Sequence, residues 1–117
     1  MSTTTDGREA ERRAAEHLER LGFTILERNY RCRLGEIDLV AEERDVLCFV
    51  EVRSRASTRY GEAIETITPA KRRRIALAAH HYLVTRRLEE RACRFDVVTI
   101  SSSGAEPELV RDAFDLE

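Results

Sequence analysis

Two carboxylates occupy positions where a negative charge is costly. Glu51 lies inside 46–52, the most apolar run of the chain, and Asp38 interrupts the apolar run 37–40. A buried carboxylate must be paired with a cation, protonated or bound to a metal ion. Carboxylate and carbonyl oxygens suit Mg²⁺ or Mn²⁺. The two acids therefore predict either a divalent-metal site or a structural salt bridge to Arg53 or to an arginine of a neighbouring helix.

The strands that carry these acids also predict their geometry. Residues 36–42 and 46–52 form an antiparallel hairpin, with a tight turn at 42–45. When the turn of a hairpin has an even number of residues, the residue numbers of two cross-strand partners sum to an odd number. Positions 38 and 51 add to 89, so both side chains face the same side of the sheet. They are then either directly opposite, with Cβ atoms about 5 Å apart, or diagonal, at about 7–8 Å.

The remaining elements complete an α/β pattern. They are a helix at 6–21, a strand at 23–30, the hairpin, a helix from 68 to about residue 91, and a strand at 94–101. Asp6 resembles the start of a capping box, Gly22 is a helix stop, and Thr68 is an N-cap followed by proline. The type of 109–114 stays open. The order α-β-β-β-α-β predicts a mixed sheet flanked by helices, in one domain spanning 1–117.

Composition narrows the class of protein. The chain has 117 residues, of which 42% are hydrophobic and 36% charged, as expected for a single globular domain. No apolar run approaches the roughly 20 residues of a membrane helix, and the polar N-terminus predicts no secretory signal. Three cysteines without a C-x-x-C pair argue against a disulfide framework or a zinc knuckle. We therefore expect a protein of the reducing cytoplasm, without a membrane partner.

Charge is unevenly distributed along the chain. The net charge is −2, but residues 53–94 hold 11 basic and 4 acidic residues between two acidic ends. This basic middle is either a footprint for a polyanion such as DNA or an ordinary solvated surface. Basic residues in the first turn of a helix oppose its dipole, which favours phosphate contact there. The candidate nucleic-acid contacts are Lys71, Arg72, Arg74 and Arg55.

The segments 35–40 and 49–53 together resemble the PD-(D/E)xK nuclease signature. More closely, the whole chain resembles the YraN-like family of small bacterial proteins, which is similar in fold to archaeal Holliday-junction resolvases. Further segments that carry the resemblance are 7–11, 22–23, 29–31, Lys71, Arg74 and 94–98. The resemblance implies a restriction-endonuclease-like core.

The resemblance also implies roles for individual residues. Asp38 and Glu51 would bind Mg²⁺ or Mn²⁺, the carbonyl of Val52 would be a third ligand, and Glu11 would complete the site. Such a site is expected to activate water for attack on a phosphodiester of DNA, with branched or structured DNA as the substrate by analogy.

Two residues depart from the family pattern. Ala10 stands where the family often has glycine. Arg53 stands where the nuclease signature has its catalytic lysine, and 19 of the 20 basic residues of this chain are arginine. Arginine keeps the charge but is bulkier and is never deprotonated. Either the charge of Arg53 suffices for catalysis, or the domain is a non-catalytic nucleic-acid-binding or adaptor module. Since one small chain presents little surface to two strands, a homodimer is also among our expectations.

Overall fold

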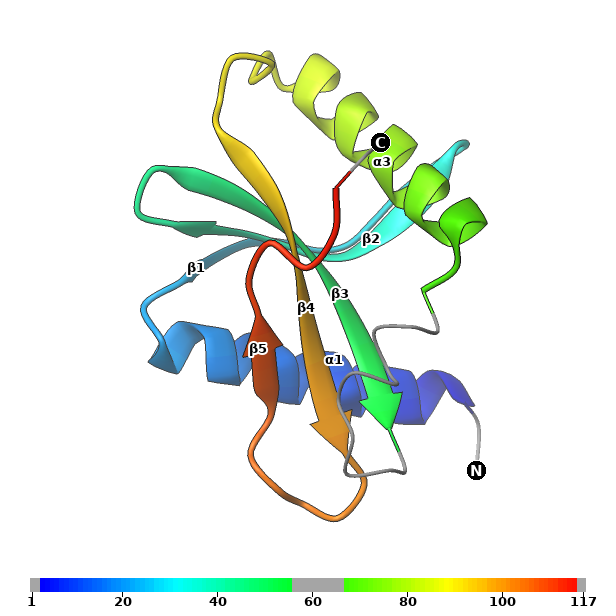
Figure 1. Ribbon diagram of the computed structural model, residues 1–117, viewed down its shortest axis with the longest axis vertical. Coiled ribbons are helices and arrows are strands. Elements are labelled where there is room, and N and C mark those ends of the chain that lie inside the picture. Colours follow the sequence, from blue (N-terminus) through cyan, green and yellow to red (C-terminus); the bar gives the residue numbers. More distant parts are fainter. Residues whose placement is uncertain (1–2, 56–66, 116–117) are drawn as a thin grey trace.

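The computed structural model describes residues 3–55 and 67–115 and confirms the predicted α/β class (Figure 1). Its elements are α1 (Thr3–Arg20), β1 (Thr24–Cys32), β2 (Gly35–Glu43), β3 (Val46–Arg55), α3 (Pro69–Thr85), β4 (Cys93–Ser101) and β5 (Glu108–Val110). The segment whose type was left open begins inside β5, and residues 56–66 lie outside the described residues. Neither described helix combines the length and apolar character needed to cross a membrane.

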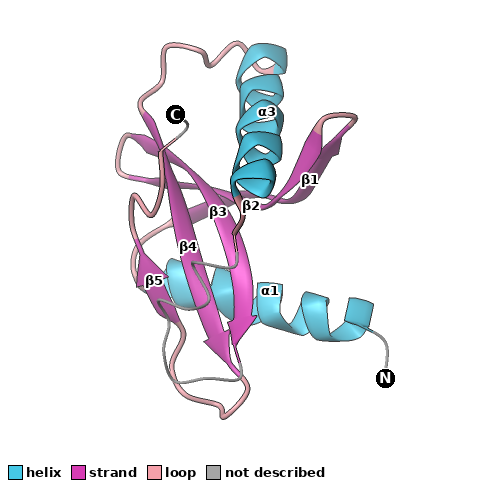
Figure 2. Cartoon of the chain, turned by 45° about the vertical axis from the view of Figure 1, so that its right-hand side comes forward, coloured by secondary structure: helices cyan, strands magenta, loops and turns pink. Residues whose placement is uncertain are grey.

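The five strands form one mixed sheet in the order β1-β2-β3-β4-β5. β3 and β4 pair in parallel, and the other neighbours are antiparallel. The connection between β3 and β4 contains α3, as expected for a crossover between parallel strands. Figure 2 shows α3 along one half of the sheet and α1 across the other half.

A buried cluster lies on each face of the sheet. On the α1 face, small side chains bring the helix close to the strands; they are Ala10, Ala14 and Ala15, with Leu18 beside them. On the α3 face, aromatic rings form a row with neighbouring centroids 5.2–5.8 Å apart, made by Tyr30, Tyr82, Phe49, Phe95 and Phe114. Each such pair contributes about 0.5–1.5 kcal/mol beyond its buried area. The row therefore holds α3 in a defined place over β3.

The end of α1 follows the prediction, but its beginning does not. Gly22 has a φ of 100°, and the N–H groups of Gly22 and Phe23 donate to carbonyls of the last turn at 3.0 Å, which makes a Schellman end. The helix begins at Thr3, so the prediction of Asp6 as its cap was wrong. An acidic residue is favourable both at the N-cap and within the first turn of a helix. The local sequence pattern therefore does not distinguish these two positions for Asp6.

The predicted end of α3 near residue 91 was also wrong. The helix ends at Thr85 because Arg87 adopts a left-handed φ of 56°. The N–H of Arg87 and the N–H of Leu88 donate back to helix carbonyls at 3.2 and 2.8 Å. This is a Schellman end in which arginine takes the place of the usual glycine, so the sequence contains no residue type that indicates the end of the helix.

Candidate functional site

Glu51 is a buried acid on β3. It follows Phe49 by two residues, so both side chains point to the face that α3 covers. Phe49 packs edge-on against Tyr82 of α3, with ring centroids 5.8 Å apart. Only 4% of Glu51 is exposed to solvent. The strand period and the packing of α3 thus place this acid under the helix.

Asp38 stands in register with Glu51, where β2 and β3 cease to pair. The last pair of the ladder is Leu39 with Val50, whose numbers add to 89, as do those of Asp38 and Glu51. One step further, the Asp38 carboxylate accepts a hydrogen bond from the N–H of Val52 at 2.8 Å. A side chain therefore takes the place of a backbone partner, and the two acids meet at the opening of the hairpin.

The surroundings of Asp38 disfavour its charge. Its pKa is raised to about 8, first by burial and then by the negative charge of Glu51, while the hydrogen bond from Val52 acts in the opposite direction. Within the described part of the chain, no lysine or arginine forms an ion pair with Asp38. Without a metal ion, Asp38 therefore holds a proton near neutral pH, and a cation between the two acids would favour its charged form.

Glu51, in contrast, contacts two cations from different elements. Nζ of Lys71 lies 2.9 Å from Oε2 of Glu51, and a guanidinium nitrogen of Arg53 lies 3.5 Å from the same oxygen. Lys71 is in the first turn of α3, where Thr68 caps the helix by accepting a hydrogen bond from the Lys71 N–H at 3.2 Å. Sequence spacing predicted Lys71 only as a nucleic-acid contact. The sequence did hold one indication that Lys71 has a specific role, because it is the only lysine among 20 basic residues.

Glu11 lies beside the acid pair and not within it. Its carboxylate accepts a hydrogen bond from the side chain of Asn29 at 2.7 Å. Burial raises the pKa of Glu11, and the negative charge of Glu11 contributes to the raised pKa of Asp38. Among the described residues, no group of three acids, histidines or cysteines is close enough to hold a metal ion. The structure thus brings two of the three predicted carboxylates together.

The donor atoms nevertheless fit a hard divalent cation. The N–H and C=O of a strand residue point to the same side, and the Val52 N–H points toward Asp38. The Val52 carbonyl therefore lies on the edge of β3 that faces β2, beyond the point where the two strands stop pairing. Two carboxylates and a carbonyl are the oxygen ligands that Mg²⁺ and Mn²⁺ prefer.

The predicted nucleic-acid contacts divide into separate environments. Arg72 faces the interior: its Nε donates to the carbonyl of Ile67 at 3.0 Å, and its guanidinium lies 5.4 Å from the ring centre of Phe114. Lys71 and Arg74 instead line a pocket of about 360 Å³. The side chain of Arg55 lies outside the described residues.

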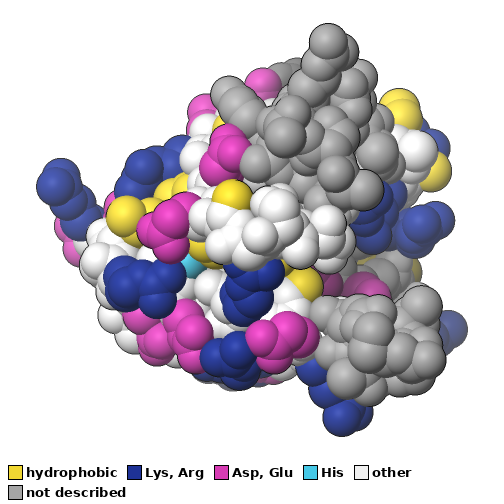
Figure 3. All heavy atoms as spheres, turned by 90° about the horizontal axis from the view of Figure 1, so that it is seen from below, with side chains coloured by type: hydrophobic (Ala, Val, Ile, Leu, Met, Phe, Trp, Pro, Cys, Tyr) yellow, Lys and Arg dark blue, Asp and Glu magenta, His cyan; other side chains and the backbone are white. Residues whose placement is uncertain are grey.

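The surface at the lower end of the molecule carries charges of both signs, unlike the mainly basic lining of this pocket. Seen from below in Figure 3, basic and acidic side chains are interspersed. On α1, for example, Arg12 is paired with Glu16 at 2.7 Å and also with Glu9. Interspersed charges of both signs offer a polyanion little net attraction.

Comparison with known proteins identifies close relatives. Residues 10–100 match the model of "Uncharacterised protein family UPF0102". A UPF0102 protein of Nitrosococcus oceani is 47% identical over 114 residues, covering 95% of this chain and 92% of the relative. One of Alkalilimnicola ehrlichii is 52% identical over 109 residues, covering 92% and 85%. One of Lachnoclostridium phytofermentans is 47% identical over 116 residues, covering 98% and 97%. The segment that matches the family model contains both acids and both cations of the site.

Proposed function

The chain belongs to the UPF0102 family of bacterial proteins, and we propose that it is a metal-dependent nuclease of the PD-(D/E)xK type that acts on DNA. The observation that carries this proposal is Asp38. It is an acid with a strongly raised pKa, it stands opposite Glu51, and it has no cationic partner among the described residues. Acids whose pKa values are strongly perturbed by burial and by a charged neighbour gather at functional sites.

The metal site would be formed by Asp38, Glu51 and the carbonyl of Val52, with Mg²⁺ or Mn²⁺ as the cation. When bound, the ion supplies a Lewis acid that activates water and stabilises the charge that develops on the phosphate. One carboxylate oxygen of Glu11 accepts a hydrogen bond from Asn29, and among the described residues Glu11 forms no group of three metal-binding side chains with Asp38 and Glu51. We therefore assign Glu11 to the edge of the site, where its charge strengthens the attraction for a cation.

Lys71 and Arg53 would bind the phosphate to be cut. Both cations reach the same oxygen of Glu51, so a phosphate held at the acid pair lies within their range. The Lys71 ammonium has three donors and can contact Glu51 and a phosphate oxygen together. Arginine side chains do not act as bases in proteins, so the role of Arg53 would be to stabilise negative charge on the phosphate.

The same two cations support a second function, nucleic-acid binding without cleavage. Lys71 and Arg53 already neutralise Glu51, as the partners of a structural salt bridge would. Arg53 also replaces the lysine of the nuclease signature. In this alternative, the acid pair contributes only to the fold, and Lys71 and Arg74 contact the phosphate backbone.

Branched or structured DNA is the first substrate to test, on analogy with resolvases alone. The radius of gyration of the Cα atoms is 13.5 Å, so one chain covers little of two strands. We therefore include a homodimer in the proposal for duplex and branched substrates.

A cleavage assay separates the two functions. Single-stranded, duplex, flap and four-way-junction DNA are incubated with the protein and Mg²⁺, Mn²⁺ or EDTA. We expect cutting that needs the metal and stops in Asp38→Asn. Asp45→Asn is the matched control, because it makes the same chemical change in the exposed turn at the other end of the β2–β3 hairpin. Cutting that persists in Asp38→Asn would contradict the proposal, and binding without any cutting would favour the alternative.

A further inference from the structure

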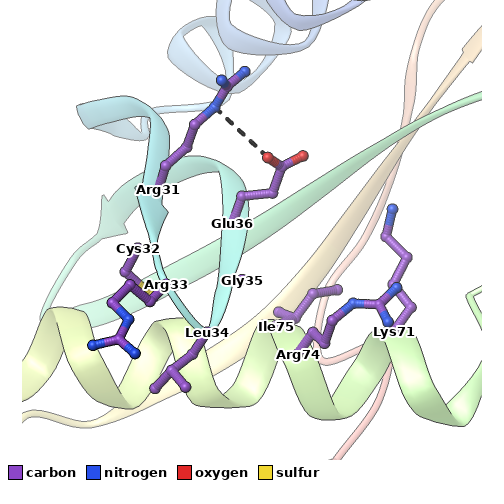
Figure 4. Close-up of a pocket in the computed structure, with 9 residues that line it drawn as sticks. All are labelled: Arg31, Cys32, Arg33, Leu34, Gly35, Glu36, Lys71, Arg74 and Ile75. Atoms are coloured by element: carbon purple, nitrogen blue, oxygen red, sulfur yellow. Dashed lines mark ion pairs between the residues drawn. The ribbon is translucent and has the colours of Figure 1, made fainter.

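A pocket of about 360 Å³ lies between the β1–β2 turn and the first turns of α3. Figure 4 shows its two sides: Lys71 and Arg74 project from α3, and Arg31 and Glu36 project from the hairpin. None of the residues in the acid pair lines it. It is therefore a neighbouring space and not the metal site itself.

The walls of this pocket are held in place by backbone packing. Gly35, which follows the β1–β2 turn, approaches α3 so closely that an added Cβ would lie 2.6 Å from the carbonyl oxygen of Arg74. Ile75, the next residue of α3, is buried in the core. The turn and the helix are thus in direct contact, and the pocket is preformed.

The charge of the pocket favours an anion. Four of its lining residues are basic and one is acidic; the basic ones are Arg31, Arg33, Lys71 and Arg74. The acid, Glu36, lies 3.6 Å from Arg31, and both side chains are largely exposed, so this ion pair is weak. Arg74 has no acidic partner among the described residues. An anion that enters the pocket therefore meets cations that are only partly compensated.

The pocket is also continuous with the acid pair. Lys71 lines the pocket, and its ammonium lies 2.9 Å from Glu51. Lys71 thus borders both the pocket and the acid pair. A nucleic-acid strand with one phosphate at the acid pair would present a neighbouring phosphate to the pocket, because consecutive phosphates follow the same strand. A free anion would not need this continuity.

We propose that the pocket between the β1–β2 turn and α3 binds a backbone phosphate of the nucleic acid, beside the phosphate that is held at Asp38 and Glu51. This inference rests on the proposed function, in that it assumes a nucleic-acid partner. It defines the path of the bound strand over the protein, which runs from the opening of the β2–β3 hairpin across Lys71 toward the β1–β2 turn. It also assigns Arg31 to the interface, a residue that the sequence did not single out as a nucleic-acid contact.

The test is the salt dependence of DNA binding, measured by fluorescence anisotropy in EDTA and in Ca²⁺. Each phosphate contact to duplex DNA contributes about 0.9 to the slope of log K against log salt. We expect the double variant Arg31→Gln/Arg74→Gln to lose about one unit of slope and about 10-fold in affinity. Glu36→Gln should act in the opposite direction and tighten binding about 2- to 3-fold, since it removes the acid of the pocket.

The matched control is Arg44→Gln/Arg87→Gln. It removes the same charge from two exposed arginines at the far ends of β2 and α3. This control should leave the slope within about 0.3 of the wild-type value. Because all four arginines are exposed, thermal melting should show that each double variant is folded.

The outcomes separate this inference from the nuclease proposal. Equal slopes for the pocket variant and the wild type would overturn the pocket, whatever the cleavage assay shows. A lower slope in a protein that binds but never cuts DNA would support the pocket and contradict the nuclease. Wild-type protein that binds no DNA would overturn both. Inorganic phosphate that raises the melting temperature of the wild type but not of the pocket variant, without DNA, would show a site for free phosphate and overturn the assignment to the backbone.

Discussion

Two clusters of two acids and two cations lie toward opposite ends of β2, and they solve the same electrostatic problem differently. The first, which we call the Arg94 cluster, joins Glu43 and Asp96 to Arg94 and Arg111. Asp96 is completely buried, yet it accepts hydrogen bonds from Nε of Arg94 at 2.9 Å and from the N–H of Asp112 at 2.9 Å. Both acids of this cluster therefore have charged donors.

The second cluster is the carboxylate site, with Asp38 and Glu51 beside Lys71 and Arg53. Here both cations contact Glu51, whereas Asp38 accepts a hydrogen bond from the N–H of Val52 and has no cationic partner among the described residues. The pKa values follow this arrangement. Hydrogen bonds from Arg111 and Arg94 lower the pKa of Glu43 to about 2, whereas burial and Glu51 raise that of Asp38 to about 8. The same residue types thus stabilise the fold in the Arg94 cluster, whereas in the carboxylate site they leave Asp38 without a cation beside it.

Neutralising the acid that has no cationic partner should have the largest effect, and the loss should be one of activity and not of stability. In Asp38→Asn we expect kcat/KM for DNA cleavage to fall by on the order of 10³-fold, since a ligand of the proposed metal is lost. The urea midpoint of the metal-free protein at pH 8 should not fall, because the amide carries no buried charge. Activity within 10-fold of the wild type would show that Asp38 is no ligand.

Removing the satisfied acid should instead affect stability. Asp96→Ala removes the acceptor of Nε of Arg94 and of the N–H of Asp112, while Arg94 keeps its contact with Glu43. We expect a loss of about 3 kcal/mol in the free energy of unfolding. Urea unfolding measures this loss. Asp45→Ala, in an exposed turn, is the control and should change stability by less than about 0.5 kcal/mol. A loss below about 1 kcal/mol in Asp96→Ala would mean that the Arg94 cluster is not structural.

Exchanging the type of cation should sharpen the contrast. Lys71→Arg keeps the charge but replaces a compact ammonium by a planar fork, and we expect cleavage to slow by about 10- to 100-fold with stability unchanged. In the wild type, two different nitrogens of Arg94 donate to Asp96 and Glu43. Arg94→Lys has a single nitrogen in place of this fork, so it should cost about 1 kcal/mol of stability. Arg53→Lys is the control within the site, and it should keep or increase activity. Equal rates for Lys71→Arg and the wild type would exclude a specific role for Lys71.

The smallest effect concerns pH. The usual pKa of Asp38 is 3.8, and in the folded metal-free protein it is about 8. Between these values the folded state holds a proton that the unfolded chain releases, so stability falls as pH rises through this window. Glu43 acts in the opposite sense, because its pKa falls from 4.5 to about 2 on folding, and its contribution is lost only in acid.

We therefore expect the melting temperature of Asp38→Asn in EDTA to exceed that of the wild type by at least about 5 °C at pH 9 and to match it near pH 4. Melting curves at half-unit steps of pH provide the comparison. A difference that does not vary with pH would indicate that the pKa of Asp38 is not raised on folding.

The contacts in and around the carboxylate site differ in how far local sequence patterns predict them. The pairing of Asp38 with Glu51 follows from the strand period of two and from an even turn, which are rules of neighbouring residues. The hydrogen bond between Glu11 and Asn29 has no such signal, because Asn29 adopts a left-handed φ of 54° within β1. Sequence resemblance therefore placed Glu11 in the site, while the backbone of β1 holds it at the edge.

By itself, the sequence determined that two acids would share one face of a hairpin in a mixed α/β sheet, because alternation and antiparallel pairing are short-range geometry. Only the tertiary structure decided which acid receives the cations. That depends on where the aromatic row sets α3 over β3, and so on the position of Lys71 above Glu51. Contacts across a crossover connection arise from the packing of distant segments, and no spacing along the chain encodes them.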